Sequence, residues 1–589
     1  MSKFLFFSIL IASLMTATSL FAQEEDVFYH TVERGQTVYS IAKMYDVKVD
    51  DIYRLNINSE ESIKAGSQLR IPQKKAAIKA EVEGVYLFHT IQAKETLYGV
   101  SQKYGVSAES IIEANPGLSN LSFATGKIIR IPSNVKPKQT TEIVETRRGV
   151  KEVYYTILEK ETVYNLCKRF KTTEQELLKL NPELAGGLRK GMTIRIPLRI
   201  NEDDISREDE LDAGEVNAML DARTAAKPVK AARIALLLPY NATNPKVIAG
   251  GSSITEYYEG MLLAADSLRR MGYITELFVF DIGDRKEDLQ KILDEDADVL
   301  ESVSLIIGGV SNEQIRLISD FALKYKKKYV IPITSKNDEV LTNAYVFQVN
   351  TPQTYLCDNA AFAAANLFDK YNIVFIDTKD KDEQTDFINT FKKELRGRTT
   401  SFRDFTYNED TFESKIIADL SADKPNLIIP LSNTEEALNK ITTVLRSITN
   451  TKPEYKITLL GYPVWQSYNK CLDDYHALDT YIYSLFYADN LNPDVKAFYD
   501  TYRNWYSKSP SQKPFPKYSM LGFDTGMYFF GSLQKHGENF ETELPATKHK
   551  SLQIGFNFER VNNWGGFINT NIYIVHYNKD FTITRSDFK

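Results

Sequence analysis

Residues 29–47 read YHTVERGQTVYSIAKMYDV, and two later stretches of the chain repeat their pattern. The later copies are FHTIQAKETLYGVSQKYGV at residues 88–106 and YYTILEKETVYNLCKRFKT at residues 154–172. In each copy a second threonine follows the first by six residues, and an asparagine follows 19 residues after that. Each copy closes with a glycine and, six residues on, the proline of an Arg-Ile-Pro triplet. These recurring intervals indicate three copies of one small module.

Each copy is predicted to fold as strand, helix, helix, strand. The second threonine can cap the first helix, whose apolar face follows the spacing i, i+3, i+4, i+7. The residues of this face are Val38, Ile41, Ala42 and Tyr45; Leu97, Val100, Ser101 and Tyr104; and Val163, Leu166, Cys167 and Phe170. In the third copy, Thr173 and Glu176 predict a capping box for the second helix. The closing proline suits the edge of a two-stranded sheet.

This pattern resembles the LysM domain, a small module that binds peptidoglycan and chitin. The resemblance covers residues 28–72, 87–132 and 153–197. It implies a shallow groove for N-acetylglucosamine units between the loop before the first helix and the loop after the second. The implied glycan-binding residues of the first loops are Gly35, Gln36, Thr37 and Val38; Glu95, Thr96 and Leu97; and Glu161, Thr162 and Val163. Those of the second loops are Asn56 and Ile57; Asn115, Pro116, Gly117 and Leu118; and Asn181, Pro182, Glu183 and Leu184.

The chemistry of these loops suits an acetamido sugar, which offers one amide for backbone hydrogen bonds and one methyl group for an apolar contact. Loop backbone at helix ends has unpaired donors and acceptors to meet it. The same threonines and asparagines also suit capping and turn formation, and the two roles are compatible. One small groove binds weakly, but three tethered grooves on one polymer gain from effective concentration.

From Arg233 onward, buried-looking strands alternate with helical stretches, which predicts doubly wound α/β sheets. The apolar strands are RIALLLPY, ELFVFDIG, SLIIGGV, KYVIPITS, NIVFIDT, NLIIPLS and KITLLGYP. About 350 residues are too many for one sheet, so two lobes are expected. The order of the pieces resembles the type I periplasmic binding protein fold over residues 232–589. The resemblance implies a ligand cleft at the carboxyl ends of the strands.

Four residues are candidates for a ligand site in that cleft. In amino-acid-binding members of the family, two loops hold a carboxylate, and the matching positions here are Ser311, Thr334 and Ser335. Asp377, which follows a strand of the second lobe, is the candidate acid. The alternative is that Ser311 and Thr334 only cap helices.

Residues 1–22 are predicted to be a cleaved export signal, because Lys3 precedes an apolar run that ends in a small residue. The alternative is a membrane anchor, although the apolar core is shorter than a spanning helix needs. We expect an exported protein of the periplasm or cell envelope with no membrane span after cleavage. Residues 198–231, acidic and then rich in small residues, are expected to form a linker.

Composition and motifs exclude several function classes. A net charge of -6 does not favour a nucleic acid partner. The three cysteines are far apart, and His30 and His89 align with Tyr155, so neither a disulfide framework nor a metal or other cofactor is expected. The chain has no HExxH or GxSxG motif and no papain-like Cys/His pair, which favours a protein that is not an enzyme.

The predicted function is binding of peptidoglycan or a related N-acetylglucosamine glycan. The C-terminal domain is then expected to be a scaffold or regulator that docks an envelope protein such as a wall enzyme. The alternative is a wall-tethered receptor for a small ligand such as an amino acid or muropeptide. A second alternative is a peptidoglycan hydrolase with an unrecognised site, because paired carboxylates can come together from distant parts of a sequence.

Overall fold

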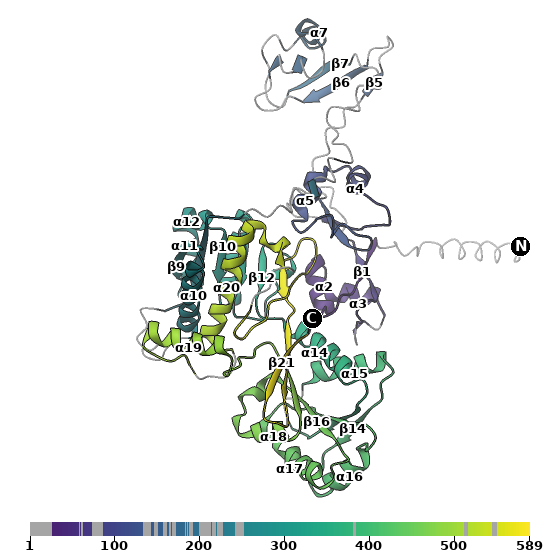
Figure 1. The fold of residues 1–589 in the computed structure, drawn as a ribbon. Coiled ribbons are helices and arrows are strands. Elements are labelled where there is room, and N and C mark those ends of the chain that lie inside the picture. The colour runs from purple at the N-terminus through teal and green to yellow at the C-terminus, as the bar shows by residue number, and fades with distance from the viewer. Residues whose placement is uncertain are drawn as a thin grey trace, which may run out of the picture.

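The computed structural model describes residues 26–57, 59–60, 63–73, 86–132, 143–145, 151–156, 162–163, 166–167, 172–182, 184, 187, 192–198, 214, 219–220, 228–241, 253–380, 384–511, 516–544 and 550–588. The predicted export signal and the candidates Glu161 and Glu183 lie outside these residues. Figure 1 shows three small modules along the chain, followed by two larger lobes. Within the described residues, no helix has both the length and the apolar character needed to cross a membrane.

The first module has the predicted order of elements. It consists of β1 (Val27–Thr31), α2 (Val38–Tyr45), α3 (Val49–Leu55) and β2 (Gln68–Pro72). The two strands pair antiparallel, with Val27 opposite Pro72. Thr37 caps α2 by accepting a hydrogen bond from the Ser40 N–H, and the four apolar residues predicted for this helix are buried. The predicted cap and helix face are therefore confirmed.

The second module repeats this construction, and the third adds a strand to it. The second contains β3 (Tyr86–Thr90), α4 (Leu97–Tyr104), α5 (Ala108–Ala114) and β4 (Ile128–Pro132). The third contains β5 (Ile143–Glu145), β6 (Lys151–Thr156), α7 (Glu174–Leu180) and β7 (Thr193–Leu198). Strand β5 precedes the predicted start of this module and completes a three-stranded sheet. The predicted capping box of Thr173 and Glu176 is present on α7.

Part of the predicted linker packs against the second module. Leu220 is buried and belongs to the same apolar cluster as Leu97, Val100 and Ile111. Most of residues 198–231 lies outside the described residues. At the ends of this range, Leu198 is the last residue of β7 and Ala231 is the first residue of β8.

Lobe 1 is built on a seven-stranded sheet in the order β18-β19-β12-β11-β10-β8-β9. Its strands are β8 (Ala231–Leu238), β9 (Ile274–Asp281), β10 (Leu305–Gly308), β11 (Lys328–Ile331), β12 (Val346–Gln348), β18 (Phe558–Arg560) and β19 (Phe567–Asn569). Its helices are α10 (Ser253–Arg270), α11 (Lys286–Glu295), α12 (Ala297–Ser302), α13 (Asn312–Tyr325), α19 (Pro493–Tyr506) and α20 (Tyr518–His536).

Lobe 2 has a second seven-stranded sheet in the order β14-β13-β15-β16-β17-β20-β21. Its strands are β13 (Asn372–Asp377), β14 (Phe402–Thr406), β15 (Asn426–Pro430), β16 (Ile457–Gly461), β17 (Thr480–Ser484), β20 (Ile572–Tyr577) and β21 (Ile583–Phe588). Its helices are α14 (Gln353–Leu367), α15 (Thr385–Gly397), α16 (Phe412–Asp419), α17 (Glu435–Thr451) and α18 (Leu472–Ala477).

Three segments cross between the lobes: 349–352, 485–492 and 570–571. Hydrogen bonds tie two of these crossings together, because the Thr351 hydroxyl donates to the Asn569 carbonyl and the Asn569 side chain donates to the Val349 carbonyl. The predicted two lobes are confirmed. Each sheet is mixed, however, because β18, β20 and β21 run antiparallel to their neighbours.

Candidate glycan-binding loops and the domain interface

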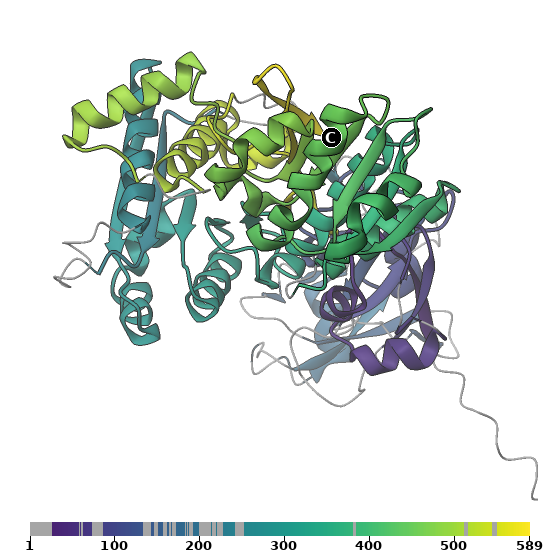
Figure 2. The ribbon, with the colours of Figure 1, turned by 90° about the horizontal axis from the view of Figure 1, so that it is seen from below.

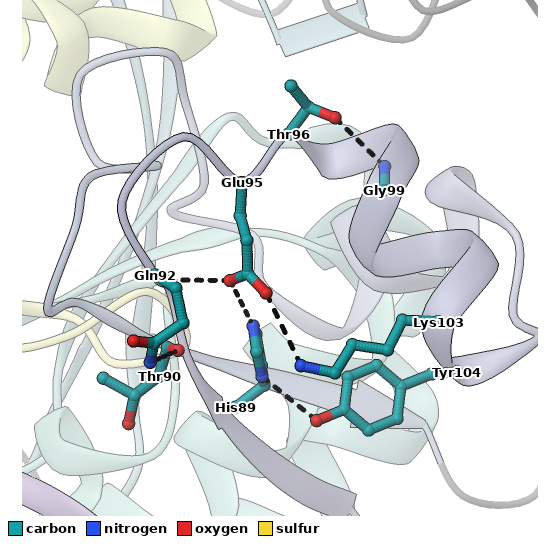
Figure 3. Close-up of polar contacts among 8 residues, drawn as sticks. All are labelled: His89, Thr90, Gln92, Glu95, Thr96, Gly99, Lys103 and Tyr104. Carbon is teal, nitrogen blue, oxygen red and sulfur yellow. Dashed lines mark hydrogen bonds and ion pairs between the residues drawn. The ribbon is translucent and has the colours of Figure 1, made fainter.

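A buried histidine fixes the first loop of the second module (Figure 3). Nε2 of His89 lies 2.8 Å from Oε2 of Glu95, and its Nδ1 lies 3.0 Å from the Tyr104 hydroxyl. The same Glu95 oxygen accepts a hydrogen bond from the Gln92 N–H at 2.7 Å. Burial opposes ionisation of Glu95, but the bonds from Gln92 and His89 outweigh it and lower the pKa of Glu95. Glu95 therefore holds the loop from inside the module.

The first module contains the same network with Gln36 in place of Glu95. Nε2 of His30 lies 2.7 Å from Oε1 of Gln36, which also accepts a hydrogen bond from the Glu33 N–H at 2.9 Å. The Tyr45 hydroxyl lies 2.8 Å from Nδ1 of His30. Burial lowers the pKa of His30, so the neutral ring is favoured. Both histidines are buried inside their modules, and the side chains of Gln36 and Glu95 point inward to meet them.

The repeated asparagine pins the second loop of every module to its last strand. The Asn56 side chain donates to the Ile52 and Arg70 carbonyls and accepts from the Arg70 N–H, each at 2.8 Å. Asn115 makes the same three bonds to Ile111 and Arg130. Asn181 makes them to Leu177 and Arg195. The asparagines therefore fix the shape of the second loop in every module.

The first loop of the second module keeps the backbone conformation of the first module although a lysine replaces its glycine. Lys94 stands at the position of Gly35, and both residues adopt a left-handed conformation, with φ of 67° and 78°.

The candidate glycan-binding residues differ in exposure. Ile57 is 90% exposed, and Thr96, Thr162 and Pro182 are also exposed. Val38, Leu97, Asn115, Leu118, Asn181 and Leu184 are buried. Val163, Pro116 and Gly117 have intermediate exposure.

A cluster of four aromatic rings joins the first two modules to lobe 1. The rings are Phe28 and Tyr45 of the first module, Phe88 of the second and Trp564 of the loop between β18 and β19. The indole of Trp564 lies 5.8 Å from Tyr45 and 5.5 Å from Phe88 between ring centroids, and Trp564 is 2% exposed. The Arg130 guanidinium lies 4.8 Å from the Trp564 ring, and burial lowers the pKa of Arg130 to about 10. The modules and lobe 1 therefore share one apolar core.

The first loop of the first module also contacts lobe 2. The Gly35 N–H donates to Oδ2 of Asp358 on α14 at 2.8 Å. A Cβ atom on Gly35 would lie 2.5 Å from the Tyr355 ring, so only glycine permits this approach. The Arg34 guanidinium lies 3.8 Å from the Phe362 ring of the same helix. Figures 1 and 2 both place the first module beside lobe 2.

The second loop of the second module contacts lobe 1. The Gly117 N–H donates to the Asn563 carbonyl at 2.8 Å, and the Asn563 side chain donates to the Ile128 carbonyl at 2.9 Å. A Cβ atom on Gly117 would lie 2.6 Å from the Arg560 side chain. Sequence reasoning missed this interface. The one available signal was the Asn-Asn-Trp-Gly-Gly loop at residues 562–566, which is rich in turn residues around a large aromatic side chain.

The candidate cleft residues make local hydrogen bonds. The Ser311 hydroxyl caps α13 by accepting from the Gln314 N–H, and the Thr334 hydroxyl accepts from the Lys336 N–H at 3.1 Å. Oδ1 of Asp377 accepts from the Lys379 N–H at 2.8 Å. Ser335 follows Thr334 in the loop after β11. These four residues lie at the carboxyl ends of β10, β11 and β13, on two different lobes, so a ligand would have to bridge them.

Comparison with known proteins matches these modules to one family. The LysM domain family matches residues 30–72, 89–132 and 155–197. The three N-terminal modules are LysM domains. Each matched range begins in the last two residues of the first strand of its LysM domain, ends at the proline of the closing strand and includes the asparagine that pins the second loop.

Curated relatives match over limited ranges. The putative sporulation-specific glycosylase YdhD of Bacillus subtilis is 33% identical over 107 residues, which cover 18% of this chain and 22% of that protein. The N-acetylmuramoyl-L-alanine amidase sle1 of Staphylococcus epidermidis is 21% identical over 168 residues, which cover 28% of this chain and 50% of that protein. The chain therefore spans at most half the length of these two relatives. The amidase matches fall on the LysM region.

Solved structures that resemble the C-terminal domain include an ABC transporter substrate-binding protein of Desulfitobacterium hafniense in complex with Leu. That structure is 14% identical, covers 60% of this chain and 100% of its own, and has a TM-score of 0.36. The leucine binding protein LivK of Thermotoga maritima is 16% identical. Its match covers 61% of this chain and 99% of that protein's chain, with a TM-score of 0.34. The observed architecture, two α/β lobes joined by three crossings, agrees with the fold that the sequence resemblance to type I periplasmic binding proteins implies.

Proposed function

We propose that this protein is an exported, non-enzymatic protein of the cell envelope that binds peptidoglycan or a related N-acetylglucosamine glycan. Its C-terminal domain serves at the wall as a scaffold or regulator of wall enzymes. The observation that carries the glycan assignment is the second loop, which the same asparagine pins with the same three hydrogen bonds in all three LysM domains. A loop held in this way presents fixed backbone donors and acceptors to a sugar amide.

The scaffold role is favoured over a receptor for an amino acid or muropeptide by the first LysM domain. A receptor of this fold closes its lobes around a ligand by hinge motion. Here the first LysM domain contacts Trp564 of lobe 1 and Asp358 of lobe 2 and braces the lobes against that motion. In addition, the hydroxyls of Ser311 and Thr334 accept local backbone hydrogen bonds, which makes them poorer ligand groups.

The hydrolase alternative has less support. The similarity to amidases falls on the LysM region and brings no catalytic residue to the C-terminal domain. The support for a binding role lies in the repeated loops, whereas no residue constellation described above points to glycoside or amide hydrolysis.

Asn181→Ala tests the glycan assignment in the third LysM domain, which stands apart from the lobes in Figure 1. Asn181 is 1% exposed, and its loss leaves the Arg195 N–H and two carbonyls without these bonds, at a cost of about 2 kcal/mol to the second loop. We expect binding of the full chain to purified peptidoglycan to weaken about tenfold, because the contribution of this loop to avidity is lost.

The matched control is Asn56→Ala, which removes the same three bonds in the first LysM domain, where the first loop lies against lobe 2 at Gly35. We expect it to weaken sedimentation with peptidoglycan much less than Asn181→Ala does. Unchanged binding by a folded Asn181→Ala chain would contradict the role of the third LysM domain. Equal losses for both variants would contradict the distinction between the two domains.

A further inference from the structure

In the first and second LysM domains, parts of the loops that the LysM resemblance assigns to glycan contact the two lobes. In the first LysM domain, the loop before α2 places the Gly35 N–H on Asp358, and the loop after α3 places the Ile63 carbonyl on the Lys393 ammonium group of α15. The first wall of the predicted groove therefore meets lobe 2 at Gly35, and the loop of the second wall meets it at Ile63, while Ile57 stays exposed. In the second LysM domain, one wall meets lobe 1 through the Gly117 N–H.

The first LysM domain contacts lobe 1 as well. The Tyr39 hydroxyl donates to Oδ2 of Asp338, in the loop between β11 and β12, at 2.7 Å. On the opposite side, Nη1 of Arg34 lies 4.0 Å from Glu394 of α15. Two lobes that three short segments connect are thus also held by a third body, at Asp338 on lobe 1 and at Glu394 on lobe 2. A change in the angle between the lobes would break one set of these contacts.

From these contacts we infer that wall glycan and lobe 2 compete for the first LysM domain. The domain is a clamp that holds the two lobes at one angle while lobe 2 covers Gly35 in the first wall of its groove, and glycan in the groove releases the clamp. This inference rests on the proposed glycan binding and adds to it a coupling between wall contact and lobe motion. Coupling of this kind is reciprocal, so weakening the clamp strengthens glycan binding.

The backbone amide of Gly35 is the point where the competition is most direct. An N–H that donates to a carboxylate at 2.8 Å is not available to an acetamido carbonyl, and one hydrogen atom cannot serve both acceptors well. The Tyr355 ring covers the face of Gly35 where a Cβ atom would be. By contrast, the described part of the third LysM domain packs around a core of its own, and Figure 1 places it away from both lobes.

The test is calorimetric titration of the full chain with the N-acetylglucosamine tetramer. Asp358→Arg removes the acceptor for Gly35 and places a positive charge beside Arg34, so it should open the groove. We expect the variant to gain one tetramer site per chain, or to bind about tenfold more tightly than wild type. Asp358→Asn keeps an acceptor oxygen and should stay close to wild type.

Controls separate the possible failures. Asp473→Arg makes the same change at an exposed position on α18 of the same lobe and should leave binding unchanged. Asp338→Arg removes the contact of Tyr39 with lobe 1, and it replaces Asp358→Arg in the titration if that variant does not fold. Equal affinity and stoichiometry in wild type and in both clamp variants would overturn the competition while glycan binding stood. An absence of binding in every chain would overturn the glycan assignment itself.

Discussion

Trp564→Ala is expected to lower the free energy of unfolding by about 3 to 5 kcal/mol, as truncation of a large buried aromatic side chain does. Trp564 is 2% exposed and contacts rings from two different LysM domains. Its loss leaves a cavity at the point where these domains and lobe 1 meet. We therefore expect the LysM domains to separate from lobe 1 at a lower denaturant concentration than wild type requires.

Trp505→Ala is the matched control, because Trp505 lies on α19 and is 48% exposed. We expect this variant to change the free energy of unfolding by less than about 1 kcal/mol. Denaturant unfolding followed by circular dichroism measures both variants. Similar losses in the two chains would show that the aromatic cluster does not join the domains.

Gly522→Ala should be the second most damaging single change. Helices α10 and α20 cross so closely that a Cβ atom on Gly522 would lie 1.9 Å from the Tyr257 carbonyl oxygen, and one on Gly260 would lie 1.9 Å from the Ser519 carbonyl oxygen. The methyl group must push two backbones apart. We expect a loss of about 3 kcal/mol in the free energy of unfolding.

Gly531→Ala on the same helix is the control for this change. A Cβ atom there would have its nearest neighbour, the Leu268 side chain, at 3.7 Å, which is ordinary contact. Alanine has a higher helix propensity than glycine, so we expect a gain of about 0.5 to 1 kcal/mol. Thermal unfolding of both variants checks this contrast. If Gly522→Ala is as stable as Gly531→Ala, the close crossing of the helices is wrong.

The elements that could be predicted from the sequence are those that short-range patterns encode. The spacing of Val38, Ile41, Ala42 and Tyr45 gave the buried face of α2, and Thr37 its cap. The apolar runs of lobe 1 and lobe 2 predicted β8, β10, β13 and β15, which are buried along most of their length. Local backbone preference and burial agree at these positions, so the prediction needed no knowledge of distant contacts.

The interface between the domains could not be predicted in this way. Gly117 and Asn563 are far apart in the chain, and neither belongs to a periodic pattern that would point to the other. The same limit applies inside the loops. Gln36 and Glu95 were assigned to glycan from their place in the LysM pattern, whereas their inward orientation depends on His30 and His89, six residues earlier in each domain.

The cleft residues show a third limit. The family resemblance makes Ser311 and Thr334 ligand candidates, and helix capping is the alternative, because a hydroxyl suits both roles. The structure shows Ser311 as the cap of α13 and leaves its ligand role a prediction. Whether one ligand can reach from Ser311 and Thr334 on lobe 1 to Asp377 on lobe 2 depends on the angle between the lobes. Contacts such as that of Tyr39 with Asp338 fix this angle.

The central claim, that the LysM domains bind wall glycan, is tested most directly by sedimentation of the full chain with purified peptidoglycan. The measurement is the pelleted fraction with and without an excess of soluble N-acetylglucosamine tetramer. We predict that the chain pellets with peptidoglycan and that the tetramer returns it to the supernatant. A chain that stays in the supernatant, or that pellets equally with and without the tetramer, would contradict the claim.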